Sequence, residues 1–284
     1  MKLSKDTKIL IVGLGLIGGS YADGLTKNGF SVSAIDTSQE SLDFALNQGM
    51  IKEGQTEPTA AFVGTFDVVI FALYPHAFID WIKKYQNFFK PGAIITDVTG
   101  VKRSIVYEIQ KLLRVDVEFI AAHPMAGKEK SGVKYANGDI FKGANYIYTP
   151  TMRNTEEACE LAQNIGEVLG FRKISSLSPE LHDEMIGFLS QLTHCIAVSL
   201  MTCKENEHLV DYTGDSFRDL TRIAYLNENM WTELFLSNKT ELLKQMELFM
   251  ERFGELYDFI RKEDTESMKR MMRLSSARRM LFNK

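Results

Sequence analysis

The chain has 284 residues, of which 45% are hydrophobic and 25% charged, and its formal net charge is −4 at pH 7. This composition is that of an ordinary globular protein with room for two domains, and the absence of a basic excess argues against general nucleic-acid binding. No apolar run approaches the roughly 20 residues that span a bilayer, and the N-terminus lacks the features of a signal peptide. The three cysteines lack C-x-x-C spacing, so we expect reduced thiols in a cytoplasmic protein, with neither a disulfide frame nor a metal site.

Residues 1–175 alternate short apolar runs with amphipathic stretches. The runs that predict strands are KILIVG, SVSAID, DVVIFAL, AIITDV, VEFIAA and ANYIYTP. Stretches such as QESLDFALNQG, which Ser38 would cap, and VKRSIVYEIQKLLR lie between most of them and predict helices. Strands that alternate with helices indicate βαβ units around a mainly parallel sheet.

The pattern changes near Leu177. Ser178 is an N-cap candidate, Pro179 would occupy the first helical position, and no convincing strand follows. Apolar residues then recur at three- and four-residue spacing, as in the stripe Phe249, Phe253, Leu256 and Ile260. We therefore predict an all-helical domain over residues 176–284, whose apolar stripes are core or subunit interface.

The segment ILIVGLGLIGGS contains a G-x-G-x-x-G pattern. It follows a predicted strand and opens a predicted helix, which is the context of a dinucleotide site. Gly13 would permit the tight turn, Gly15 would leave room for a pyrophosphate, and Gly18 would let helix and strand pack closely. The first helical amides, at Leu16 and Ile17, would face the phosphates. A glycine turn that binds nothing is the alternative.

Asp36 decides which dinucleotide we expect. Its carboxylate would accept hydrogen bonds from a ribose and repel a 2′-phosphate, and the following TSQES has no arginine to receive one. We therefore expect NAD rather than NADP. Ligands bind beyond the carboxyl ends of such strands, which places Tyr74 and Pro75 at the cofactor. We also expect Pro124 to end the strand VEFIAA and His123 to emerge there as an acid–base group.

Four sequence blocks occur in a characteristic order: the glycine fingerprint, HPMAGKEKSG, LSQLTHCIA, and FRDLTRIA followed by a tryptophan. With them the chain resembles, over nearly its full length, the prephenate and arogenate dehydrogenases of tyrosine biosynthesis. The resemblance implies a Rossmann-type NAD-binding domain over 1–175 and a helical domain over 176–284 that forms a homodimer. It also implies oxidative decarboxylation of prephenate, a dicarboxylate, to 4-hydroxyphenylpyruvate, with hydride transfer from ring C4 to NAD.

The same resemblance implies roles for individual residues. His123 stands at the position of the family's catalytic histidine and would accept the proton of the 4-hydroxyl. Arg222 matches the arginine that pairs with a substrate carboxylate, and Asp219 would hold its guanidinium in place. Three further positions match residues around the substrate: His194, Glu129 at the pocket rim and Trp231. Core packing is the alternative for the histidine and tryptophan, and a solvated loop charge for the glutamate.

Two departures from the family pattern leave alternatives open. The family's D-x-G-S-x-K is DVTGVK here, so Gly100 replaces the serine and Thr99 is the nearest hydroxyl, pointing in a different direction. Asp215 replaces a usual glycine and would favour the amino group of arogenate, unless it is paired or turned outward. Arogenate dehydrogenase is therefore one alternative. A protein that binds NAD without turnover is another, and a β-hydroxyacid dehydrogenase, which lacks the histidine block, is a third.

Overall fold

The computed structural model describes residues 1–128, 130–205 and 208–283. They divide into two compact units, Met1–Asn238 and Lys239–Lys284. The first unit holds every strand among the described residues and the helices as far as Ser237, and the second holds a pair of long helices.

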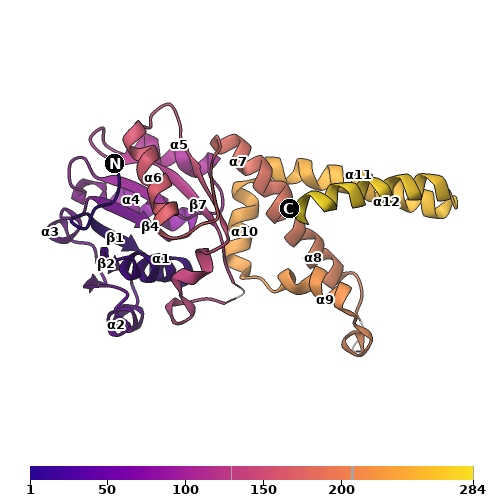
Figure 1. Ribbon diagram of the computed structural model, residues 1–284, viewed down its shortest axis with the longest axis horizontal. Helices are drawn as coiled ribbons and strands as arrows, with labels where there is room; N and C mark the ends of the chain where they lie inside the picture. The colour runs from indigo at the N-terminus through magenta and orange to yellow at the C-terminus, as the bar shows by residue number, and fades with distance from the viewer. Residues whose placement is uncertain (129, 206–207, 284) are drawn as a thin grey trace. The chain divides into compact units, whose positions relative to one another are not determined.

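Six parallel strands form the central sheet of the first unit, in the order β3-β2-β1-β4-β5-β6. They are β1 Lys8–Val12, β2 Ser31–Ile35, β3 Gly54–Gln55, β4 Val68–Phe71, β5 Ile94–Asp97 and β6 Glu118–Phe119. Figure 1 labels β1, β2 and β4 of this sheet. The connecting helices are α1 Leu16–Lys27, α2 Gln39–Asn47, α3 Ala60–Val63, α4 Pro75–Tyr85 and α5 Arg103–Leu112, with the 3₁₀ turn η1 at Gln86–Phe88. The strand order reverses direction at β1 and β4, the point where such sheets bind ligands.

The core lies on both faces of this sheet, as in other parallel sheets. Side chains alternate along β1, so Ile9 and Ile11 join one apolar cluster while Leu10 and Val12 join the other. All four are buried, and each such side chain contributes roughly 1.5–3 kcal/mol relative to an exposed one. The mainly parallel sheet expected from the apolar runs is confirmed.

The run VEFIAA is not one strand. It divides into β6 and β7, Ala121–Met125, and β7 belongs to a second sheet with β8 Asn145–Thr149 and β9 Lys173–Ser176. His123 pairs with Ile147 and Pro124 with Tyr146, so the strand continues through the histidine and the proline. The expectation that Pro124 ends the strand is wrong, because β7 is an edge strand and an edge tolerates proline.

The remaining elements among the described residues are helical, as expected for the second half of the chain. Within the first unit these are α6 Glu156–Val168, α7 Pro179–Ile186, the π-helical turn η4 Gly187–Gln191, α8 Leu192–Thr202, α9 Asp215–Thr221 and α10 Glu228–Ser237. Short 3₁₀ turns are η2 Val133–Tyr135, η3 Gly138–Phe141, η5 Leu209–Tyr212 and η6 Arg222–Ala224. The second unit contains α11 Lys239–Arg261, α12 Thr265–Met280 and η7 Leu281–Asn283.

The continuous helix Pro179–Thr202 is 24 residues long and reaches a mean hydropathy of 1.4 over an 18-residue window. By length and composition it is apolar enough to cross a membrane, so the expectation that no run approaches this limit is wrong. The finding is weak evidence for a span, since a core helix of a globular protein passes the same test. The helix also carries the buried polar side chains of His182, Asp183 and Gln191, which lipid would disfavour.

Candidate active site

The glycine loop between β1 and α1 has the geometry of a phosphate-binding turn. Gly13 has a φ of +96°, and a Cβ there would lie 2.6 Å from the carbonyl oxygen of Ala72. A Cβ at Gly18 would lie 1.9 Å from the carbonyl oxygen of Gly13, whereas one at Gly15 would meet no protein atom within 4 Å. Packing therefore requires glycine at 13 and 18, while the open side of Gly15 leaves space for a ligand to approach the backbone.

The residues around this loop fit a dinucleotide. Leu16 and Ile17 open α1, so their amides lie in its first turn, where anions are stabilised. Asp36 follows β2, and its carboxylate accepts hydrogen bonds from the amides of Leu14 (2.6 Å) and Ser38 (2.8 Å). This fixes an acceptor beside the loop. Tyr74 and Pro75 follow β4, the neighbour of β1, as the N-cap and first residue of α4.

His123 lies in the middle of β7 and is partly buried. Its Nδ1 is 2.9 Å from Nε2 of His182. Its Nε2 faces the loop after β5, since a Cβ at Gly100 would lie 3.9 Å from that nitrogen. Burial, with smaller effects of His182 and the Lys102 charge, lowers the pKa of His123 well below its usual value. The ring is therefore neutral near pH 7 and can accept a proton.

Behind His123 lies a fully buried pair at the start of α7. Nδ1 of His182 donates to Oδ1 of Asp183 at 2.7 Å. The carboxylate of Asp183 also accepts hydrogen bonds from the amides of Lys102 (2.8 Å) and Arg103 (2.9 Å), at the N-terminus of α5. Burial lowers the pKa of His182, and its hydrogen bond to Asp183 opposes that shift.

A second buried group lies at the carboxyl end of β5. Nζ of Lys102 is 2.7 Å from Oδ2 of Asp97 and 3.0 Å from the hydroxyl of Thr99. The other oxygen of Asp97 accepts a hydrogen bond from the amide of Ala122, the residue before His123. The Thr99 hydroxyl also contacts Asp97 and the carbonyl of Val101. In the described part of the chain no hydrogen bond joins Thr99 to His123, so this hydroxyl belongs to the Asp97–Lys102 group.

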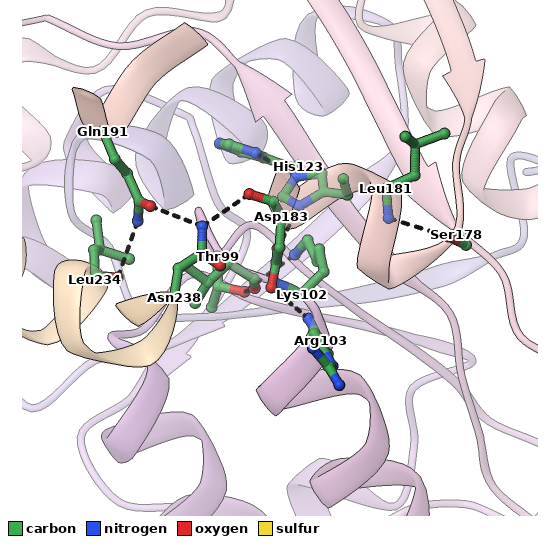
Figure 2. Close-up of polar contacts among 12 residues, drawn as sticks. Thr99, Lys102, Arg103, His123, Ser178, Leu181, Asp183, Gln191, Leu234 and Asn238 are labelled. Carbon is green, nitrogen blue, oxygen red and sulfur yellow. Dashed lines mark hydrogen bonds and ion pairs between the residues drawn. The ribbon is translucent and has the colours of Figure 1, made fainter. Parts of the chain in front are cut away.

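Amide side chains connect this region to α10 (Figure 2). Nδ2 of Asn238 donates to the carbonyl oxygen of Asp183 and to Oε1 of Gln191, both at 2.8 Å. Nε2 of Gln191 donates to the carbonyl of Leu234 at 2.9 Å. Gln191 is the last residue of the π-helical turn, a distortion often found at functional sites.

Four of the predicted substrate residues lie on the helices after this turn. His194 on α8 is stacked on Trp231 of α10, with ring centroids 3.8 Å apart, and its Nδ1 is 2.9 Å from the carbonyl oxygen of Ser190. Arg222 is exposed and begins η6, which packs against α8. Asp219 is exposed on α9, one turn earlier.

Comparison with known proteins identifies the family. Residues 21–175 match the model of the prephenate dehydrogenase nucleotide-binding domain, and residues 178–274 match that of the prephenate dehydrogenase dimerization domain. The chain belongs to the prephenate dehydrogenase family.

Individual members of the family match nearly the whole chain. Prephenate dehydrogenase of Bacillus subtilis is 30% identical over 94% of this chain and 74% of its own length. That of Lactococcus lactis is 31% identical over 92% of this chain and 73% of its own length. A crystal structure of prephenate dehydrogenase from A. aeolicus, in complex with hydroxyphenyl propionate and NAD+, has a TM-score of 0.89 and 32% identity, and covers 99% of this chain and 100% of that one.

The family's sequence blocks indicated His123, His194, Arg222 and Trp231, but not the buried polar pairs beside His123. Glu129, expected at the pocket rim, lies outside the described residues. The buried Asp97–Lys102 pair and the His182–Asp183 pair were not predicted as site residues. The segment DVTGVK could have indicated the first pair, since a lysine five residues after a strand-end aspartate is a candidate ion-pair partner for it. Nothing local distinguishes LHDEM from an ordinary exposed helical turn.

Proposed function

We propose that this chain catalyses the NAD-dependent oxidative decarboxylation of prephenate to 4-hydroxyphenylpyruvate. Membership of the prephenate dehydrogenase family supports the reaction, and the relative in complex with NAD+ supports the cofactor. The observation that carries the proposal is the neutral ring of His123, whose Nε2 faces the end of β5 in a sheet that bears the dinucleotide loop. Bound NAD would supply the hydride acceptor.

The chain's own residues would hold the substrate and remove one proton. His123 would accept the 4-hydroxyl proton at Nε2, and its lowered pKa keeps that atom available as a base at neutral pH. Arg222, with Asp219 behind it, would bind a substrate carboxylate. We assign the stacked pair His194 and Trp231 to the substrate side chain.

The helical segment is proposed to form the homodimer. Residues 178–274 match the family's dimerization domain. Large apolar side chains on α11 are exposed, among them Phe253 at 63%, Tyr257 at 61% and Ile260 at 59%. A second copy of the chain would bury such a surface. Light scattering after gel filtration should give twice the chain mass of 32.2 kDa. The cytoplasmic location of the protein stays a prediction.

Arogenate is the alternative substrate, and it would be favoured by an unpaired Asp215 carboxylate that faces the site. The Asp215 side chain is 92% exposed and paired with Arg218 at 2.8 Å, so its charge is turned outward and partnered. The test follows NADH absorbance with the purified protein, NAD and either prephenate or arogenate. Prephenate should give the larger kcat/KM, and NADP should replace NAD poorly. NAD binding without NADH formation from either substrate would refute the proposal.

A further inference from the structure

The strongest unexplained feature is the polar pair behind His123. His182 and Asp183 are 0% and 1% exposed, and burying polar groups is costly unless they are hydrogen-bonded. Both are fully engaged: Asp183 accepts hydrogen bonds on each carboxylate oxygen, and His182 bridges Asp183 to His123. The chain of contacts therefore runs from a carboxylate, through one imidazole, to the imidazole that we assign as the base.

The Asp183 carboxylate determines which nitrogen of each imidazole carries the hydrogen. A carboxylate only accepts, so Nδ1 of His182 must carry a hydrogen toward Asp183. A neutral imidazole has one N–H, so Nε2 of His182 is then an acceptor. The atom facing it at 2.9 Å is Nδ1 of His123, which must donate. Nε2 of His123 is left with its lone pair, pointing toward the loop at Gly100.

We propose that His182 and Asp183 are positioning residues that hold the proton of His123 on Nδ1 and thereby keep Nε2 as the proton acceptor. The inference rests on the proposed function in taking the substrate hydroxyl as the group that meets Nε2. Burial of both imidazoles, which keeps them neutral, maintains the one-hydrogen count on each ring. The alternative tautomer of His123 would place a hydrogen where the substrate proton has to go.

Asp183 also has a structural role, and the test must distinguish this role from the positioning of the His123 proton. It accepts from the first amides of α5 and so stabilises that helix whatever His123 does. His182 is the discriminating residue, since its side-chain hydrogen bonds among the described residues join it to Asp183 and His123. A misplaced tautomer of a catalytic histidine lowers kcat by about 10⁴ in a serine protease triad.

The experiment compares three variants of the full chain. His182→Phe keeps a planar buried ring and removes the acceptor. His182→Gln restores an acceptor, because its side-chain oxygen can take the place of Nε2 and accept from Nδ1 of His123. Tyr107→Phe is the matched control. It deletes a different side-chain contact between α5 and α7, the 2.6 Å hydrogen bond from Tyr107 to Glu180, and leaves the histidines intact.

Two readouts are taken. Steady-state kinetics should show that His182→Phe lowers kcat roughly 10- to 10³-fold with less than a threefold change in the KM for prephenate, and that His182→Gln regains at least tenfold. Nitrogen-15 NMR of histidine-labelled protein reports the tautomer directly. The signal of His123, assigned by its loss in His123→Asn, should show an Nδ1–H in wild type and His182→Gln, and a shift toward Nε2–H in His182→Phe.

The possible results separate the two proposals. A wild-type His123 that carries its hydrogen on Nε2 overturns the inference, whether or not the protein turns over prephenate. Loss of kcat in Tyr107→Phe equal to that in His182→Phe also overturns it, because helix packing then explains the effect. A wild type with the Nδ1–H tautomer but no NADH formation refutes the proposed function and leaves the positioning of the proton intact.

Discussion

Removing the Lys102 charge tests the buried group beneath the candidate base. Lys102 and Asp97 are 0% exposed on both side chains and 2.7 Å apart, and Asp97 also holds the backbone beside His123. The substitution Lys102→Met keeps the stem and leaves the Asp97 carboxylate buried without its cation. Breaking a buried pair in this way costs about 3–5 kcal/mol. For a domain of this size that lowers Tm by about 6–20 °C, at about 2–4 °C per kcal/mol.

The assay is thermal unfolding at fixed protein concentration without ligands, since ligands and dimerisation shift Tm. Lys142→Met is the matched control. Its ion pair with Asp139 has the same 2.7 Å separation, but the side chains are 71% and 57% exposed. Exposed pairs contribute little, so that variant should change Tm by less than about 2 °C. Removing both charges with Asp97→Asn and Lys102→Met should recover part of the loss. Equal Tm values for the two single lysine variants would refute the reasoning.

The same variant makes a kinetic prediction with a fixed sign. The Lys102 charge is one of the causes that lower the pKa of His123. Its removal should raise that pKa, and kcat/KM depends on the neutral ring, which is lost as pH falls through the pKa. The acidic limb of the kcat/KM profile should therefore move to higher pH in Lys102→Met. A limb that moves to lower pH contradicts the electrostatic account.

The other predictions concern the base, the cofactor loop and pH. His123→Asn should lower kcat by roughly 10²–10⁴ and leave NAD affinity, measured by calorimetry, within about threefold of wild type. Full activity in that variant removes His123 from the mechanism. Gly15→Val should weaken NAD binding at least about tenfold with little change in Tm, because its Cβ meets no protein atom, while Gly18→Val should lower Tm through its clash with the backbone. The reverse pattern contradicts the loop assignment. Burial lowers the pKa of both His123 and His182, so the unfolded chain binds more protons below about pH 6.5. Urea unfolding should therefore show stability falling from pH 7.5 to 5.5, with a flatter dependence in the variant that combines His123→Asn and His182→Gln.

Much of the fold was predictable because the local pattern of apolar and polar residues indicates the strands and helices. Strand β1 is four consecutive buried aliphatic residues after Lys8, which indicates a strand covered on both faces. The fingerprint was predictable for a related reason: backbone sterics at Gly13 and Gly18 admit no side chain, so the sequence must show glycine there.

The division of VEFIAA between two sheets was not predictable in this way. One residue, Ile120, separates β6 from β7, and its amide still bonds to Ile95 of the central sheet. A continuous apolar run gives the same local signal whether its strands pair with one sheet or two, because pairing partners lie far away in sequence. β8 lies more than 20 residues beyond His123 and decides the matter by pairing with it.

The buried pair His182 and Asp183 on α7 was not predicted, because its local sequence resembles that of an exposed helix. An adjacent histidine and aspartate in the first turns of a helix are common on protein surfaces, where acidic groups favour helix N-termini. Their burial comes from packing against the start of α5, about 80 residues earlier, and from Asn238 on the other side. Sequence spacing contains neither contact.

The residue at position 100 does not decide which nitrogen of His123 carries the proton. A serine would fit at this position, since its Cβ would lie at 3.6–3.9 Å from Leu234 and His123, in ordinary contact. Its hydroxyl would reach Nε2, yet a hydroxyl both donates and accepts, so it pairs equally with either tautomer of the ring. A carboxylate only accepts and therefore fixes every proton along the chain of contacts that it begins. With or without a hydroxyl at residue 100, the choice of the accepting nitrogen on His123 belongs to Asp183.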